Sequence, residues 1–128
     1  MMSKVTSALM AGSDREQARK LTKSLRCRIE SEWAYLLRKH DGEVVEQPQP
    51  GGRTVFDYAS CVVRFSQLEM LVSEGRGEVY VQVRSSPQAH WADLTAVLGA
   101  QTPRPQAGLA AFEEVIARSW SSLVDHMP

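Results

Sequence analysis

The sequence predicts an α+β fold, in which an antiparallel β-meander of three to four strands packs against a long N-terminal helix and two C-terminal helices. Two observations support this prediction. Apolar residues recur every three or four positions near both ends of the chain, and they alternate with polar residues in its middle. A chain of 128 residues can bury one hydrophobic core but not two, so residues 1–128 are expected to form a single domain.

The long N-terminal helix is predicted over residues 14–39. Ser13 and Glu16 have the spacing of a capping box, which would start the helix, and Asp41-Gly42 would end it. Residues 1–12 are expected to form a separate short helix or a flexible tail, because Gly12 and Ser13 interrupt the pattern. One face of the predicted helix is apolar and carries Ala18, Leu21, Leu25, Ile29, Trp33 and Leu36.

The meander is predicted from apolar–polar alternation over residues 61–66, 68–73 and 78–84. Residues 54–58 are expected to add a further strand, with Ala59-Ser60 as a turn or bulge. Residues 44–45 fit either a small strand or a packed loop. Residues 46–53 hold two prolines and a glycine pair, and they are expected to form a loop.

Two tight turns would set the register of the meander. We expect one turn at Ser66-Gln67 and a type II′ turn at Gly75-Arg76, where glycine suits the first central position. Both turns place the apolar residues of neighbouring strands on one face. The expected pairs are Val63–Met70 and Cys61–Val72 across the first turn, and Val72–Val79, Met70–Val81 and Leu68–Val83 across the second.

The C-terminal third is predicted to be helical. Residues 90–100 are expected to form a short helix that carries Trp91, and residues 109–126 a longer one. Residues 101–108, which contain two prolines, connect the two.

The net charge of zero conceals an uneven distribution. Residues 1–40 hold nine basic and four acidic side chains, a balance of +5, and the remainder holds six basic and eleven acidic, a balance of −5. The two parts either attract each other within one fold or mark an interaction surface. No long apolar segment or signal peptide is visible, and two cysteines are too few for a disulfide framework. We therefore expect a cytoplasmic protein with reduced thiols and no membrane span.

Catalytic and metal-binding motifs are sparse, so we expect no enzymatic activity, no catalytic residue and no cofactor. His90 and Asp93 lie three residues apart and could share a metal, but no third ligand accompanies them. Asp93 is better explained as a first-turn helix residue. Cys27 lies between Arg26 and Arg28 but has no positioned base that would make it a nucleophile.

The polar face of the predicted hairpin is the candidate partner-binding site, because it mixes tyrosine, arginine and acids. An acidic patch of Glu69, Glu74 and Glu78 would suit a basic partner such as a nuclease. The basic N-terminal helix offers an alternative as a nucleic-acid contact, and a small-ligand-binding domain is a further alternative. The candidate residues are Glu69, Glu74, Arg76, Glu78, Tyr80, Gln82 and Arg84.

The segment VVRFSQLEMLVSEGRGEVYVQVRSS, followed by HWADLTAVLGA, resembles small bacterial immunity-type proteins of polymorphic-toxin and contact-dependent inhibition systems. The resemblance covers about residues 54–100. It implies a protein that neutralises a cognate toxin by direct binding and without catalysis.

Overall fold

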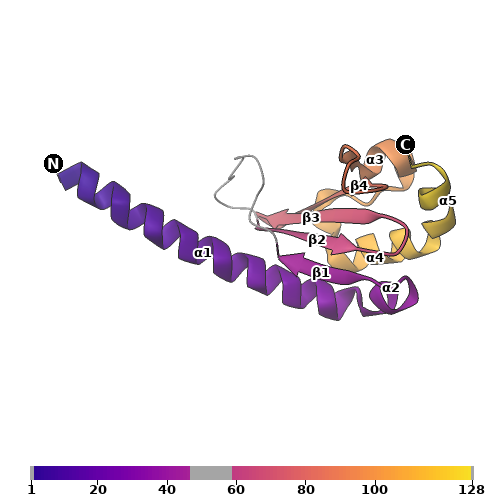
Figure 1. Ribbon diagram of the computed structural model, residues 1–128, viewed down its shortest axis with the longest axis horizontal. Helices are drawn as coiled ribbons and strands as arrows, with labels where there is room; N and C mark the ends of the chain where they lie inside the picture. The colour runs from indigo at the N-terminus through magenta and orange to yellow at the C-terminus, as the bar shows by residue number, and fades with distance from the viewer. Residues whose placement is uncertain (1, 47–58, 128) are drawn as a thin grey trace.

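The protein has an α+β fold, as the sequence predicts (Figure 1). The computed structural model describes residues 2–46 and 59–127, and for residues 2–15 and 18 it describes only the backbone. Five antiparallel strands form one sheet in the order β1-β2-β3-β4-β5. The strands and the helices that flank them are α1 Met2–Glu32, α2 Ala34–Lys39, β1 Glu43–Glu46, β2 Ala59–Arg64, β3 Glu69–Gly75, β4 Glu78–Arg84, β5 Ala92–Asp93, α3 Leu94–Leu98, the 3₁₀ helices η1 Gly99–Gln101 and η2 Pro105–Ala107, α4 Leu109–Arg118 and α5 Trp120–Asp125.

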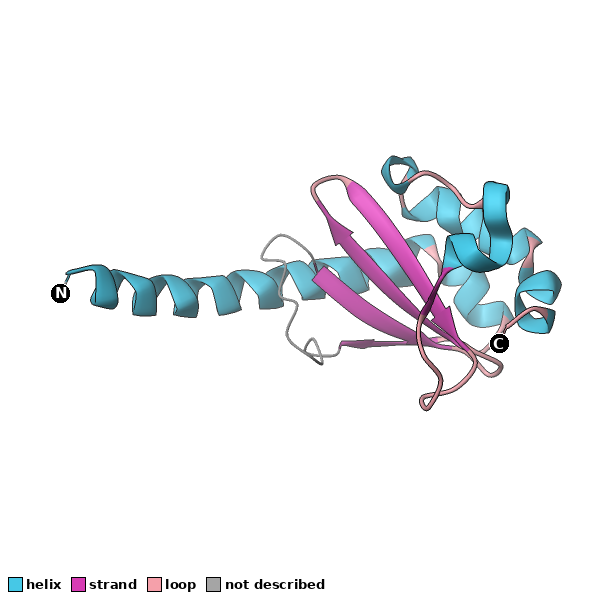
Figure 2. Cartoon of the chain, turned by 90° about the horizontal axis from the view of Figure 1, so that it is seen from above, coloured by secondary structure: helices cyan, strands magenta, loops and turns pink. Residues whose placement is uncertain are grey.

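Helix α1 differs from the prediction at both ends. It begins at Met2, so Gly12 and Ser13 lie inside it and the expected capping box is wrong. A glycine within a helix costs only about 1 kcal/mol, which the neighbouring turns offset. At the other end the helix breaks at Trp33, and α2 continues from there. The N-terminal part of α1 extends well beyond the sheet (Figures 1 and 2).

The predicted end of the N-terminal helical region at Asp41-Gly42 is confirmed, and it follows α2. Asp41 takes the left-handed conformation, with φ of 52°, and the Gly42 N–H donates to the Leu37 carbonyl at 2.8 Å. A Cβ atom on Gly42 would lie 2.6 Å from side-chain atoms of Leu37 and Phe65. Only glycine allows this close approach of the backbone to the core.

The predicted register of β2 and β3 is confirmed. Cys61 pairs with Val72 and Val63 with Met70, and the Phe65 N–H donates to the Leu68 carbonyl at 2.9 Å across the turn. Of the two alternatives for residues 44–45, the structure shows the strand, as part of β1. The turn or bulge expected at residues 59–60 is wrong, because both residues belong to β2. Glu46, which was expected to begin the loop at 46–53, belongs to β1 instead. The rest of that loop and the strand expected at residues 54–58 lie outside the described residues.

The predicted register of β3 and β4 is wrong by two residues. The turn lies at Arg76-Gly77, and both residues have positive φ, 53° and 75°. Two positive φ values are typical of a type I′ turn, which favours glycine at the second central position. The observed partners are Gly75–Glu78, Glu74–Val79, Val72–Val81 and Met70–Val83. Because the shift is even, the same side chains stay on the same face of the sheet.

The C-terminal helices are shorter than predicted. Ala92 and Asp93 form β5, the fifth strand, where the helix over residues 90–100 was expected, and α3 begins only at Leu94. The connector at residues 101–108 contains η2. The helix expected over residues 109–126 is broken at Ser119 into α4 and α5.

The core lies between the sheet and the helices, on what we call the helical face of the sheet. Leu25, Ile29 and Trp33 of the predicted apolar stripe are fully buried, which confirms that face of the helix. The Trp33 Nε1–H donates to the Leu109 carbonyl at 2.9 Å and so joins the two helical ends of the chain. The sheet contributes Cys61, Val63, Met70, Val72, Val79, Val81 and Val83 to this core.

Candidate protein-binding face

The opposite side of the sheet, which we call the second face, carries polar side chains from all five strands. Its composition follows from strand geometry, because successive side chains of a strand point to opposite faces of the sheet and every second one points away from the core. Ser60 and Val62 of β2 are buried on this face, whereas Tyr80 of β4 is 43% exposed. The exposed part of the second face therefore includes β4 and, on β2, the side chain of Arg64, which is 49% exposed. The second face contains Glu43, Val45, Ser60, Val62, Arg64, Glu69, Leu71, Ser73, Glu78, Tyr80, Gln82, Arg84 and Asp93.

One end of β4 carries a compact charged cluster. Glu69 is only 7% exposed, and its carboxylate accepts hydrogen bonds from Arg84 Nη2 at 2.7 Å and Arg84 Nε at 2.8 Å. Its other oxygen lies 3.4 Å from Arg64 Nε. The Arg84 guanidinium also stacks on Trp91, with its Cζ 4.0 Å from the ring centroid. Arg84 is thus held in one orientation by a carboxylate and an indole.

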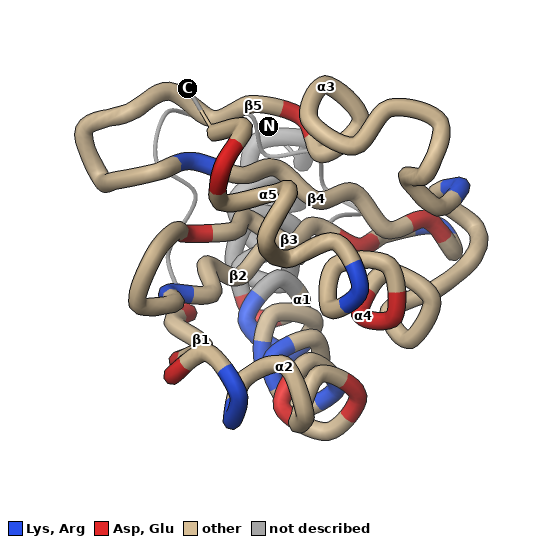
Figure 3. Tube along the Cα trace, turned by 90° about the vertical axis from the view of Figure 1, so that its right-hand side faces the viewer, with Lys and Arg blue, Asp and Glu red and all other residues tan. Residues whose placement is uncertain are grey.

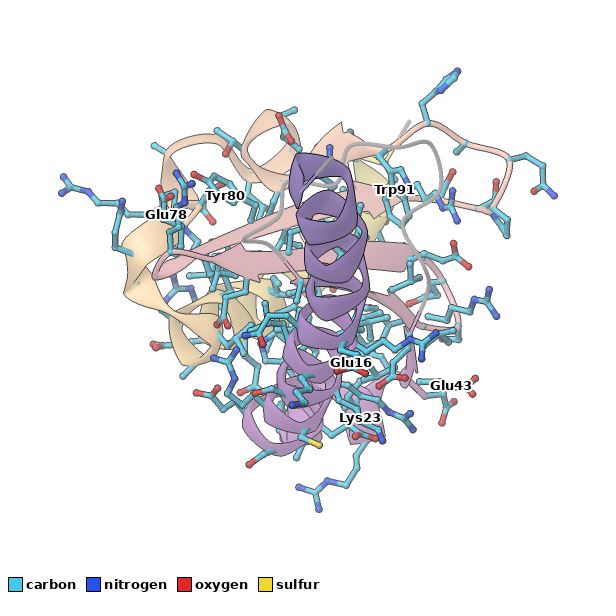
Figure 4. The ribbon with its side chains drawn as sticks, turned by 90° about the vertical axis from the view of Figure 1, so that its left-hand side faces the viewer. Glu16, Lys23, Glu43, Glu78, Tyr80 and Trp91 are labelled. Carbon is cyan, nitrogen blue, oxygen red and sulfur yellow. The ribbon has the colours of Figure 1, made fainter. Side chains whose placement is uncertain are left out.

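The rest of β4, from Glu78 to Gln82, carries hydroxyl and amide contacts. Tyr80 Oη donates to Glu78 Oε2 at 3.0 Å, and Gln106 Nε2 lies 3.5 Å from the same oxygen. Gln82 Nε2 donates to Asp93 Oδ1 at 3.4 Å. Figure 4 shows Glu78 and Tyr80 together at one end of the sheet and Trp91 toward the other.

Five of the seven predicted site residues come together on the second face, and two do not. Glu69, Glu78, Tyr80, Gln82 and Arg84 line β3 and β4 there. The other two are Glu74 and Arg76: Glu74 points to the helical face, where Arg28 of α1 pairs with it, and Arg76 lies in the turn.

Trp91 and Asp93 are site residues that the sequence interpretation assigned to a helix start. The chain after β4 returns to the sheet as β5 and brings both to the second face. Strand β5 has only two residues, which is too short for an alternation pattern to reveal it.

The uneven charge distribution is partly internal. Arg26 lies 3.9 Å from Glu46 of β1, and Arg28 pairs with Glu74 of β3, so α1 meets acids from the negative part of the chain. Arg19, Lys20 and Lys23 remain exposed on α1, and Figure 3 shows the concentration of basic residues along this helix. The charge pattern is therefore explained by internal pairing at Arg26 and Arg28, whereas an interaction surface at the exposed basic residues of α1 stays a prediction.

The two cysteines have different surroundings. Cys61 is fully buried against α1, and burial raises its pKa to about 12, with Glu46 adding to the effect. Such a thiol stays protonated and unreactive at neutral pH. Cys27 is exposed. Within residues 2–46 and 59–127, no three His, Cys, Asp or Glu side chains gather as metal ligands would.

Comparison with known proteins gives no family to which the chain can be assigned. No protein-family model, no curated protein and no solved structure matches it. Among the described helices, none is both long enough and apolar enough to cross a membrane.

Proposed function

We propose that the protein is a protein-binding module that engages its partner through the β4 side of the second face, acting as an immunity-type inhibitor of a bacterial toxin. The observation that carries the proposal is the Arg84–Trp91 stack, fixed by Glu69 and placed on the same strand as the exposed Tyr80. Tyrosine, tryptophan and arginine are the residue types that dominate binding energy at protein interfaces.

The fixed geometry of this face favours binding over an incidental wet surface. A side chain that is ordered before association loses less conformational entropy in the complex, a saving of about 0.5–1.5 kcal/mol for a long side chain. Arg84 is ordered by three hydrogen-bonding and stacking contacts, and Gln82 by its contact with Asp93.

The expected acidic patch contributes less to this proposal than the aromatic and arginine side chains. Glu69 is neutralised by two arginines and Glu74 by Arg28. A basic partner such as a nuclease would therefore meet chiefly Glu78 and Asp93, at the rim of the face. Rim charges affect association rate more than affinity.

The proposal is tested by co-expressing the protein with the toxin-like product of the reading frame next to its gene, and by calorimetry on the two purified proteins. We expect cell survival and tight binding with the wild type. Trp91→Ala should weaken binding by about a hundredfold, as for an interface hot spot. The neighbouring exposed His90 supplies the control, since His90→Ala should change neither readout. Absence of both protection and binding would reject the proposal.

The exposed basic residues of α1 favour a second candidate function, a contact with nucleic acid. Arg19, Lys20 and Lys23 form an exposed group that no described acid neutralises. If it binds nucleic acid, affinity for a DNA or RNA duplex must fall steeply as salt rises. No affinity at low salt would eliminate this candidate.

A further inference from the structure

Strand β1 is the first strand in the order of the sheet, so among the described residues it has a neighbouring strand on its inner side alone. In an antiparallel ladder, successive residues direct their N–H and C=O groups alternately to the two sides of a strand. The hydrogen bond from the Phe65 N–H to the Leu68 carbonyl fixes this alternation, because it shows that the main chain of Phe65 faces β3. The main chain of Arg64 therefore faces β1, where its partner is Glu43.

The same alternation assigns the four residues of β1. Glu43 and Val45 direct their main-chain groups to β2, so Val44 and Glu46 direct theirs to the outer side. Within the part of the chain that the structure describes, neither Val44 nor Glu46 makes a main-chain hydrogen bond on that side. The outer edge of β1 therefore presents N–H and C=O groups at every second residue, which is the spacing that an added strand requires.

A row of alternating charges crosses the second face and ends at this edge. It consists of four successive cross-strand neighbours on β1 to β4, namely Glu43, Arg64, Glu69 and Arg84. Glu69 binds both arginines, whereas Glu43 is exposed and has no ion-pair or hydrogen-bond partner among the described residues. Figure 4 shows Glu43 on the side of the molecule opposite Glu78. The row thus ends in an unpaired carboxylate, and a basic residue on an added strand would continue it.

An apolar row runs beside the charged one. Val45, Val62 and Leu71 are paired across β1, β2 and β3 on the same face. Val62 is buried, whereas Val45 at the edge is partly exposed. An aliphatic side chain opposite Val45 on an added strand would bury the rest of its surface. The residue opposite Val45 lies two positions from the residue opposite Glu43, so both side chains point to the second face.

We propose that the outer edge of β1 is a docking site for an extended segment of a partner protein, which pairs with β1 as an antiparallel strand. The segment carries an aliphatic residue opposite Val45 and, two residues later, a lysine or arginine opposite Glu43. A second copy of this chain fits less well, because it would bring Glu43 and Glu46 close to the same glutamates of the copy. The site lies at the other edge of the sheet from Trp91 and does not depend on the function proposed for the β4 side.

The test uses the blocked peptide acetyl-TTVTKT-amide and the backbone amide signals of the ¹⁵N-labelled protein. Titration should shift the amides of Val44 and Glu46 and slow their hydrogen exchange, since both gain hydrogen bonds. The exchange of Glu43 and Val45 should change little, because their N–H groups already face β2. This difference between alternate residues distinguishes strand addition from binding elsewhere on the surface.

Two modified peptides serve as controls. Acetyl-TTVKTT-amide has the same composition but places valine and lysine on opposite faces of the added strand, and should bind about fivefold more weakly. N-methylation of the two threonines that flank the valine removes the N–H groups that would face β1. This peptide should bind about tenfold more weakly or not at all.

Reversal of the charge at Glu43 tests the predicted ion pair. Glu43→Lys should weaken binding of acetyl-TTVTKT-amide about fivefold and strengthen binding of acetyl-TTVTET-amide by a similar factor. Glu114 of α4 is also exposed and supplies the matched control. Glu114→Lys changes the net charge equally and should leave the affinity for both peptides unchanged.

Two substitutions of Glu46 test the main-chain pairing at one position. Glu46→Pro removes an N–H that faces away from β2, so it should abolish peptide binding while the ladder to β2 stays intact. Glu46→Ala keeps this N–H and should bind the peptide as the wild type does.

The proposal is overturned if the amides of Val44 and Glu46 do not shift at millimolar peptide. It is equally overturned if acetyl-TTVKTT-amide binds as well as acetyl-TTVTKT-amide, or if Glu46→Pro binds as tightly as Glu46→Ala. The same shifts on concentrating the protein without peptide would assign the edge to a second copy and overturn the proposal as well.

Discussion

The two faces of the sheet are built from alternate residues of the same strands, yet different interactions hold them. On the helical face Met70, Val72 and Val83 are fully buried among apolar side chains. On the second face Glu69 and Arg84, from the same strands, form charge-assisted hydrogen bonds. The first face contributes mainly hydrophobic burial and the second mainly oriented polar contacts.

This difference separates stability from recognition. Apolar packing is non-directional, and a substitution that removes side-chain volume from it lowers the free energy of unfolding in proportion to that volume. Substitutions on the helical face should therefore destabilise the fold. Polar contacts at a partly exposed face are worth less to folding but fix the positions of side chains that a partner can recognise. Substitutions along β4 should therefore affect binding more than stability.

The largest expected effect is on the helical face, at Trp33. Trp33→Ala removes a fully buried indole and its hydrogen bond to Leu109, and should lower the free energy of unfolding by about 3–5 kcal/mol. Urea denaturation measures the loss. Tyr35, which is 52% exposed, is the control: Tyr35→Ala should cost no more than about 0.5 kcal/mol. Similar losses at both positions would contradict the contrast between buried and exposed aromatics.

A smaller loss is expected on the second face, at Glu69. Glu69→Gln keeps the shape of the side chain but leaves Arg64 and Arg84 without their shared carboxylate, which should cost about 1–3 kcal/mol. Glu114→Gln, at an exposed position of α4, should be close to neutral. A neutral Glu69→Gln variant would show that the charged cluster does not order this face.

The buried thiol of Cys61 predicts a dependence of stability on pH. Its pKa rises from an ordinary 9.0 to about 12 in the folded protein, chiefly because of burial. As the pH rises, the thiol therefore loses its proton in the unfolded chain before it does so in the folded protein. The stability that the protonated Cys61 contributes is full below pH 9 and falls as the pH rises from 9 toward 12. By pH 10 the loss should be about 1 kcal/mol.

Denaturation curves of the wild type and Cys61→Ala between pH 8 and about pH 10 separate this contribution from other alkaline effects. The variant should lose stability less steeply. Iodoacetamide supplies a second readout, since it should alkylate the exposed Cys27 in the native protein and Cys61 only after unfolding. Equal slopes, or rapid labelling of Cys61, would contradict its burial.

Substitutions in the turn between β3 and β4 should change the free energy of unfolding by about 1 kcal/mol or less. Gly77 has φ of 75°, so Gly77→Ala forces a Cβ into the left-handed region and should cost about 1 kcal/mol. Arg76 has φ of 53°, and asparagine tolerates this conformation better than arginine. Arg76→Asn should therefore raise the free energy of unfolding slightly. If Gly75→Ala proved more harmful than Gly77→Ala, the register would be that of a turn at residues 75–76.

This turn also illustrates what the sequence could predict. Alternation identified the strands and the apolar face, because the buried face of each strand repeats every second residue. It did not fix the β3–β4 register, since Gly75-Arg76-Gly77 fits a type II′ turn at its first two residues and a type I′ turn at its last two. Both placements bury the same valines, so hydrophobicity cannot distinguish them.

The candidate site was predictable to a similar extent. Tyr80, Gln82 and Arg84 share a face by alternation alone. The same rule places Glu74 with Val72 on the helical face, so the prediction of an acidic patch that combines Glu74 with Glu69 is wrong. The position of Trp91 depends on how residues 85–91 return to the sheet, and no local pattern in that segment determines its path.

The most direct test of the central claim compares binding and folding in one variant, Trp91→Ala. The partner to be tested is the toxin-like product of the neighbouring reading frame, which should kill cells unless this protein is co-expressed. Calorimetry should show affinity reduced by about a hundredfold, while the urea midpoint stays close to that of the wild type. Unchanged affinity in a folded variant would contradict the assignment of the β4 side of the second face as the binding surface.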